Sequence, residues 1–113
     1  MHPDLHAARE RIRDGLSSAM DELAASETIA AGKACENTFL KTRFSEARAQ
    51  AAQGAGRPLA GLAVSIKDLF DFQGETTAAG SRVLQDAAPV ASHAPAVQRL
   101  VAAGGAIIGR TNM

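Results

Sequence analysis

Apolar residues recur at helical spacing through the first part of the chain. From about Asp4 to Ala25, the large aliphatic side chains are three, four or seven residues apart, with charges between them. This spacing predicts an amphipathic helix capped by Asp4. Gly15 destabilises the middle of a helix by about 1 kcal/mol relative to alanine, so two shorter helices are an open alternative. The segment SETIAAGKACEN then predicts a connection, and a further helix is expected from Thr38 to Gln53.

After Pro58 the pattern changes from helical spacing to alternation. Apolar residues alternate with small or polar ones from Leu62 to Lys67, and a period of two predicts a β-strand. The following QGETTAAGS is typical of turns, PAVQRLVAAGG predicts a short helix with Pro95 in its first turn, and AIIGRTNM predicts a second strand. Such a strand–helix–strand unit normally forms a parallel pair. The pattern therefore predicts an α/β fold, with an N-terminal helical region (1–57) before the start of an α/β core (58–113).

The predicted sheet is too small to stand alone. Two strands do not make a stable buried sheet by themselves, and the sequence stops at Met113, directly after the second of them. We therefore expect an incomplete piece of a larger fold. The alternative is a chain whose strands pack against a partner protein.

Composition and charge mainly exclude classes of function. Twelve basic and twelve acidic residues cancel, so no net field attracts nucleic acid or an acidic membrane, and neither is an expected partner. The single cysteine, Cys35, forms no internal disulfide, and the three histidines are scattered, so no metal site is expected. The first residues are charged, and no run approaches the roughly 18 apolar residues of a membrane span. A cytoplasmic protein is the default expectation.

Lys67 is the candidate for chemistry, because it ends the first predicted strand just before a loop rich in glycine, threonine and serine. A lysine acts as a base only when neutral, and at its ordinary pKa of about 10.4 only about 4 in 10,000 molecules are neutral at pH 7. Burial lowers the pKa of a lysine, and the apolar neighbours Ile66, Leu69 and Phe70 fit a desolvated strand end. From the residues alone, the alternative is a lysine that is exposed or paired with Asp68.

The two aspartates after this strand also allow two interpretations. Asp68 and Asp71 could form a general acid/base pair. We interpret them instead as turn and cap residues that hold the loop after the strand, because aspartate commonly bonds nearby backbone groups in turns.

The text PLAGLAVSIKDLFDFQGETTAAGSRVL, followed by APAVQRLVAAGGAIIGRTNM, resembles the N-terminal part of the amidase signature family. The match covers about half the chain and keeps the order and spacing of SIKD, TTAAGS and GRTNM. Members of this family hydrolyse or transfer amides with a Ser–cisSer–Lys triad, and the resemblance assigns the lysine of that triad to Lys67. The bridging and nucleophilic serines of the family follow the matched motifs, so this chain contains neither.

The resemblance also implies surroundings for Lys67. It implies an incomplete piece of the amidase mixed sheet, a small amide as substrate, a buried Lys67 without metal or cofactor, and a chain that is inactive by itself. It leaves a homodimer of the intact enzyme open. Five residues are expected beside the site in supporting roles: Asp68, Thr77, Ser81, Thr111 and Asn112.

Two alternatives to an amidase fragment stay open. One is the A subunit of the aminoacyl-tRNA amidotransferase, which resembles the amidases, uses the same triad on glutamine and works with partner subunits. The other is a non-enzymatic stub that binds a partner through its N-terminal helices. A downstream reading frame that encodes a Gly/Ser-rich continuation would favour the amidase, and a genuine stop would favour the stub.

Overall fold

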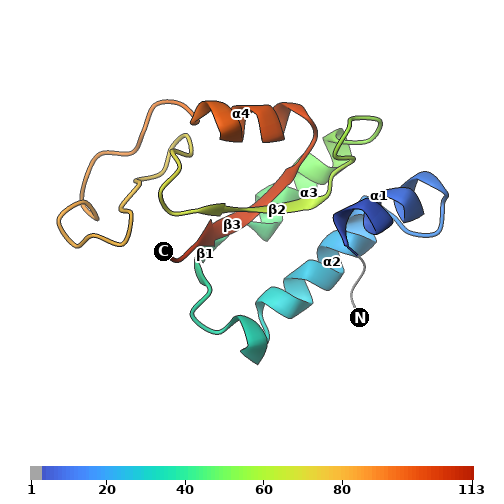
Figure 1. The fold of residues 1–113 in the computed structure, drawn as a ribbon, viewed down its shortest axis with the longest axis horizontal. Helices are drawn as coiled ribbons and strands as arrows, with labels where there is room; N and C mark the ends of the chain where they lie inside the picture. Colours follow the sequence, from blue (N-terminus) through green and yellow to red (C-terminus); the bar gives the residue numbers. More distant parts are fainter. Residues whose placement is uncertain (1–3) are drawn as a thin grey trace.

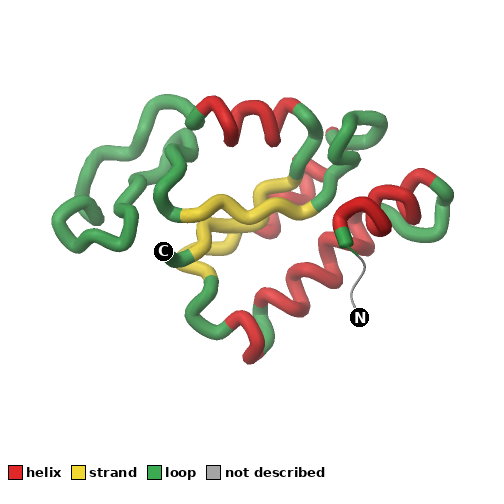
Figure 2. The backbone as a smooth tube through the Cα atoms, viewed as in Figure 1, coloured by secondary structure: helices red, strands yellow, loops and turns green. Residues whose placement is uncertain are grey.

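The computed structural model describes residues 4–113, which form helices around one small sheet (Figure 1). In chain order the elements are α1 (Leu5–Arg13), α2 (Ala19–Ala30), the 3-10 turn η1 (Lys33–Cys35), β1 (Phe39–Thr42), α3 (Phe44–Gln53), β2 (Ala63–Lys67), α4 (Pro95–Ala102) and β3 (Ala106–Thr111). The sheet has three strands in the order β1-β3-β2 (Figure 2). The central strand, β3, pairs parallel with β2 and antiparallel with β1. The predicted α/β class and the parallel pair are confirmed.

The N-terminal amphipathic segment forms two helices, which was the alternative to one long helix. Gly15 has a φ of 75°, a left-handed conformation that glycine adopts without steric cost, and it lies in the turn between α1 and α2. Each helix begins at a side-chain cap. The Asp4 carboxylate accepts a hydrogen bond from the Ala7 amide at 2.8 Å, and the Ser18 hydroxyl accepts one from the Asp21 amide at 3.1 Å.

Two predictions about the N-terminal region were wrong. α2 continues to Ala30, into the segment that was expected to be a connection, because Ala30 packs against the buried side chains under the sheet. The helix expected from Thr38 begins only at Phe44, because Phe39–Thr42 instead pairs with β3 as a strand. The region 1–57 is therefore not purely helical, since it supplies the third strand of the sheet. The division of the chain into two domains at residue 57 stays a prediction.

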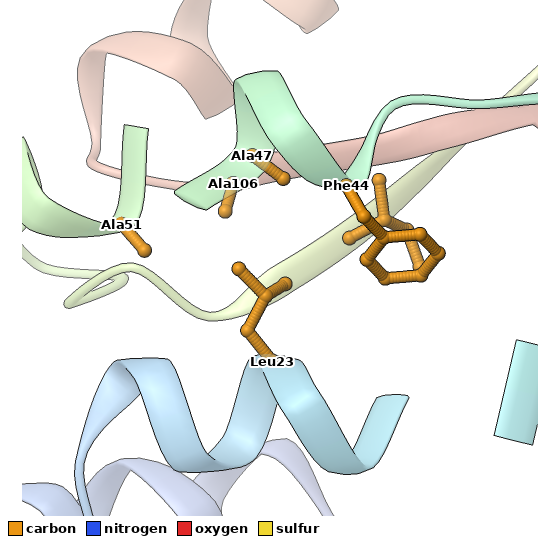
Figure 3. Close-up of a cluster of buried hydrophobic side chains, with 6 residues drawn as sticks. Leu23, Phe44, Ala47, Ala51 and Ala106 are labelled. Carbon is orange, nitrogen blue, oxygen red and sulfur yellow. The ribbon is translucent and has the colours of Figure 1, made fainter. Parts of the chain in front are cut away.

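Helices cover both faces of the sheet. On one face α2 and α3 cover the sheet, and buried side chains of these helices and of β3 form a cluster that we call the α2–α3 core (Figure 3): Leu23, Phe44, Ala47, Ala51, Ala106 and Ile108. On the other face Val97 of α4 packs against Ile66, Phe72 and Ile107, and Figure 1 shows α4 on the side opposite α2. Successive residues of β3 thus point to opposite faces, which explains why this strand is apolar along most of its length.

β1 approaches β3 so closely that one position of β3 must be glycine. A Cβ atom on Gly109 would clash with the carbonyl oxygen of Lys41 and lie 3.0 Å from the Phe39 ring and 3.2 Å from the Thr42 Cα atom. The pairing of β1 is irregular between Phe39 and Lys41. A side chain at position 109 would therefore push β1 away from the sheet.

The helices in the described part of the chain, residues 4–113, are short. None of them is long and apolar enough to cross a membrane.

Candidate functional site

The carboxyl ends of β2 and β3 lie side by side. Lys67 is the register partner of Thr111, and the Asp68 amide donates to the Thr111 carbonyl oxygen at 3.0 Å. Asn112, the residue after Thr111, donates its amide to the Thr38 carbonyl oxygen at 2.8 Å. In open α/β sheets, ligands bind outside the carboxyl ends of the strands. Four of the predicted site residues are therefore together at the end of the sheet where a ligand is expected.

Lys67 itself is exposed. It ends β2, which is an edge strand, and Leu69 and Phe70, which were expected to shield it, are 43% and 40% exposed. The lysine borders a cavity of about 200 Å³ between β2 and α4, lined also by Ser65 and Ala96. The expectation of a buried ammonium is wrong for these 113 residues, because only one side of β2 has a neighbouring strand among residues 4–113. The role of Lys67 as a base stays a prediction.

Asp68, the next residue, has the opposite environment. It is 3% exposed, and its partner is Arg110 of β3 rather than Lys67. Nη2 of Arg110 donates to Oδ1 of Asp68 at 2.8 Å, and Nη1 donates to the carbonyl oxygen of Phe70 at 2.7 Å. A single guanidinium thus fastens both the aspartate and the turn that follows β2 to the central strand. This arrangement agrees with the interpretation of Asp68 as a turn-holding residue.

Glu75 joins Arg110 to charges from the N-terminal part of the chain. Its Oε1 lies 2.7 Å from Nη1 of Arg43 and 3.0 Å from Nζ of Lys41. Its Oε2 is buried without a hydrogen bond among the described residues and lies 3.7 Å from Nε of Arg110. We call these residues the strand-end cluster: Lys41, Arg43, Asp68, Glu75 and Arg110.

The charges around Glu75 keep it ionised. Burial by itself would raise the pKa of Glu75, but hydrogen bonds from Lys41 and Arg43, together with the positive charges of both, hold that pKa below its ordinary value. Arg43 is also fixed from another side, because its guanidinium carbon lies 4.7 Å from the centre of the Phe72 ring. The strand-end cluster therefore combines charge-assisted hydrogen bonds, which are stronger than neutral ones, with packing against an aromatic ring.

Sequence analysis did not identify four members of the strand-end cluster. Arg110 gave a usable signal, since a charge at the end of a strand that is otherwise buried requires a counter-ion. The sequence contains no comparable signal for Lys41, Arg43 or Glu75. The Arg43–Glu75 bond spans 32 residues, and no spacing rule connects a residue before a helix to a residue in a loop.

The TTAAGS loop also lies at the strand ends. Thr76 and Ala78 line a cavity of about 380 Å³ together with Asp68, Glu75 and Arg110. A Cβ atom on Gly80 would lie 3.1 Å from Cγ of Met113, so the far end of this loop packs against the residues after β3. The loop thus lies beside Asp68, as the resemblance implied.

The predicted hydroxyl residues of this loop bond within the loop. Oγ1 of Thr77 donates to Oδ1 of Asp71 at 2.9 Å, and Oγ of Ser81 accepts from the Val83 amide at 3.2 Å. The Asp71 carbonyl oxygen also accepts from the amide of Ala94 at 3.0 Å, and these bonds agree with the interpretation of Asp71 as a turn residue. Thr77 and Ser81 shape the loop, and their position relative to a substrate stays a prediction.

A larger cavity within residues 4–113 lies away from the strand ends. It measures about 540 Å³ and is formed by α1, the start of α2 and the loop after α3. Its charged side chains are arginines, namely Arg9, Arg13 and Arg57. Because no candidate base or nucleophile–base pair lines it, the cavities at the strand ends are the better candidates for catalysis.

The chain is similar to proteins of one known family. Residues 22–113 match the family described as Amidase. The chain belongs to the amidase family. It is 40% identical over 113 residues to AtzE, a 1-carboxybiuret hydrolase component of Pseudomonas sp. (strain ADP), covering 92% of this chain and 25% of that protein. It is 50% identical over 70 residues to the A subunit of the glutamyl-tRNA(Gln) amidotransferase of Nitratidesulfovibrio vulgaris (strain DP4), covering 60% of this chain and 14% of that protein.

Solved structures of the amidase family have the same fold. A 6-aminohexanoate cyclic dimer hydrolase complexed with substrate superposes with a TM-score of 0.86 at 28% identity over 97% of this chain and 23% of its own. A chain from a vestigial protein complex that reveals the evolutionary origins of an s-triazine catabolic enzyme gives a TM-score of 0.86 at 36% identity over 98% of this chain and 26% of its own. The chain thus spans about a quarter of the length of the relatives that it matches. The predicted family and the predicted piece of the amidase mixed-sheet fold are confirmed.

Proposed function

We propose that this chain is the lysine-bearing part of an amidase-family enzyme that hydrolyses the carbon–nitrogen bond of a small carboxamide. The observation that carries the proposal is the position of Lys67. In a chain that matches the amidase family over residues 22–113, this lysine ends β2 at the carboxyl end of the sheet, followed directly by Asp68, which shares a cavity with the TTAAGS loop.

In the proposed reaction Lys67 is the base. A serine hydroxyl becomes a strong nucleophile only when a neighbouring base takes its proton. Neutral Lys67 accepts this proton through a bridging serine, while the hydroxyl oxygen attacks the amide carbon and the amine leaves with a proton. Water then hydrolyses the acyl-serine. Both serines would come from outside the 113 residues, and the chemistry requires no metal and no organic cofactor.

The exposure of Lys67 sets a condition on this proposal. Lowering the pKa of a lysine from about 10.4 to about 7 corresponds to roughly 4–5 kcal/mol of differential stabilisation, which burial can supply. The open side of β2 and the cavity of about 200 Å³ beside α4 are where further polypeptide would remove Lys67 from water. We therefore propose that the 113 residues alone do not hydrolyse amides.

A second candidate function is the glutaminase step of an amidotransferase. The observation that favours it is the identity of 50% over 70 residues with the A subunit of a glutamyl-tRNA(Gln) amidotransferase. In that case the substrate would be glutamine, and the chain would act in a complex with partner proteins rather than as a homodimer. Direct contact with nucleic acid is not part of either proposal, because the net charge of the chain is zero. The cytoplasm is the proposed compartment for both, in agreement with a single cysteine and hence no internal disulfide.

The experiment uses the protein at its natural length and measures ammonia released from 1-carboxybiuret, glutamine and benzamide. Lys67→Ala should lower kcat/KM at least 1,000-fold. Lys67→Arg should lower kcat/KM by as much, because arginine keeps the charge but is not deprotonated in proteins. Lys33→Ala is the matched control, the same change at an exposed lysine of η1, and should leave the rate unchanged.

The substrate profile distinguishes the two candidates. Preference for glutamine, and a rise in rate on addition of tRNA and partner proteins, would favour the amidotransferase. Full activity of Lys67→Ala would refute Lys67 as the base in both. Dialysis against EDTA should leave hydrolysis unchanged, and a loss that added metal restores would contradict chemistry without a metal.

A further inference from the structure

Within residues 4–113, the backbone around Lys67 is paired with another strand on one side only. β2 is an edge strand, and its ladder to β3 is irregular between Val64 and Ser65. After Lys67 the chain turns at once, because the Lys67 carbonyl oxygen accepts from the amide of Leu69 at 2.7 Å and from that of Phe70 at 3.1 Å. The direction in which the lysine side chain leaves the sheet therefore depends on how this turn is fastened to β3.

Arg110 adds side-chain bonds to the backbone bond from the Asp68 amide to the Thr111 carbonyl oxygen. Among residues 4–113, the side-chain hydrogen bonds between β3 and the turn after β2 are the two that this arginine donates, to Asp68 at 2.8 Å and to the Phe70 carbonyl oxygen at 2.7 Å. The side chains of Arg110 and Asp68 are only 4% and 5% exposed. Since two bonds from one planar guanidinium fix both distance and direction, the turn has little freedom to rotate about the end of β2.

Stability alone does not explain a charged pair at this position. Replacing a buried ion pair by well-packed apolar residues is often neutral or even stabilising. An apolar pair in place of Asp68 and Arg110 would also leave the Phe70 carbonyl oxygen without the donor that it has now. Unlike apolar contacts, the ion pair fixes the orientation of the groups that it joins. The functional side chain nearest to it in sequence is that of Lys67.

We propose that Asp68 and Arg110 are positioning residues for Lys67. Their buried pair, joined to the Phe70 carbonyl oxygen, sets the place and direction of the lysine side chain at the end of β2. The catalytic meaning of this inference rests on the proposed function, whereas its structural part does not. Glu75, with Oε2 3.7 Å from Nε of Arg110, is a second acidic neighbour of the guanidinium.

Two conservative variants test the proposal in the protein at its natural length. Arg110→Lys keeps the charge opposite Asp68, but an ammonium cannot form the same fork to the aspartate and the Phe70 carbonyl oxygen. Asp68→Asn keeps the shape and removes the charge, and it decides the question if Arg110→Lys fails to fold. Arg43→Lys is the matched control, because it makes the same change in the strand-end cluster without a bond to the turn.

The first measurement separates kcat from KM for ammonia release from the best amide of the panel. A displaced base lowers kcat about 10- to 100-fold and leaves KM within about twofold, because the lysine takes part in the chemical step and not in binding. Arg43→Lys should retain kcat within about twofold, and circular dichroism checks that each variant is folded.

The second measurement does not depend on activity. Reductive methylation with ¹³C-formaldehyde labels lysine amines, and the Lys67 resonance is assigned by its loss in Lys67→Arg. We expect Asp68→Asn and Arg110→Lys to shift or broaden this resonance, and Arg43→Lys to leave it in place. An unchanged Lys67 resonance in both folded variants overturns the proposal, whether or not kcat falls. If Lys67→Ala retains full activity, the proposed function fails, and the resonance alone still decides the positioning role.

Discussion

The α2–α3 core and the strand-end cluster both contain residues of β3, but different forces hold them. Ile108 belongs to the core and packs against alkyl and aromatic side chains, whereas Arg110, two residues later, bonds to carboxylate and carbonyl oxygens. Burial of apolar surface is non-directional and does not depend on protonation. Charge-assisted hydrogen bonds need fixed angles and a fixed charge state. The core therefore stabilises the fold, while within the strand-end cluster the bonds from Arg110 connect the turn after β2 to β3.

The largest expected loss of stability comes from breaking the cluster at its centre. Arg110→Met removes the partner of Asp68 and leaves a carboxylate that is 3% exposed without a counter-charge. We expect the free energy of unfolding in urea to fall by about 3–5 kcal/mol. The double variant Asp68→Leu/Arg110→Met should recover most of this loss, because no unpaired charge is then buried. A loss below about 1 kcal/mol for the single variant would show that Asp68 is hydrated in solution.

The second-largest expected loss of stability comes from truncating a side chain of the α2–α3 core. Leu23 is 2% exposed and lies between α2 and α3 (Figure 3), and Leu23→Ala should cost about 3 kcal/mol through lost burial and a residual cavity. Unlike the loss in Arg110→Met, this loss should be independent of salt. Leu40→Ala is the control at a leucine that is 56% exposed, and it should cost far less. Equal losses at both positions would contradict the packing described for α2.

A methyl group between the strands should have an intermediate effect. Gly109→Ala would force β1 away from β3, because the new Cβ meets the Lys41 carbonyl oxygen and the Phe39 ring. We expect a cost of about 1–3 kcal/mol, as for other overpacked sites. Hydrogen exchange should be faster at the amides of β1 and unchanged in α2. Uniform acceleration in both elements would mean that the sheet does not open locally at β1.

The smallest predicted effect is a dependence on pH. The folded-state pKa of Glu75 is lowered, so its stabilising contribution is complete above the ordinary glutamate pKa of about 4.3 and is lost as the pH falls through the folded value. Glu75→Gln should therefore be less stable than the parent at pH 7, with the difference shrinking toward pH 3. Thermal unfolding at both pH values measures this. A constant difference between the two pH values would contradict the lowered pKa.

The part of the fold that depends on regular spacing was predictable. Alternation identified β2, and Pro95 identified the start of α4, because these signals involve residues that are close in the chain. β1 was missed because Phe39 and Phe44 also fit an apolar helix stripe, and a four-residue strand is too short to show a period. Its pairing with residues 109–111 depends on contacts that no local pattern contains.

The candidate site was predictable only in part, for a similar reason. The motif around Lys67 and the TTAAGS loop identified the correct end of the sheet. The burial of Asp68 and the exposure of Lys67 did not follow from the sequence, since both depend on which neighbour faces each side chain. Asp68 pairs with Arg110 of β3 and not with the adjacent lysine, which was one of the alternatives that the sequence left open.

The central place of β3 in the sheet has a consequence for biosynthesis. Both other strands depend on it for their pairing, yet it is the last of the described elements to leave the ribosome. At translation rates of roughly 5–20 residues per second, synthesis of the 44 residues that follow Lys67 up to Thr111 takes roughly 2–9 s. Until then β2 has no partner strand. During that interval the nascent polypeptide carries two unpaired strands, and it is then a natural client for chaperones that shield apolar segments.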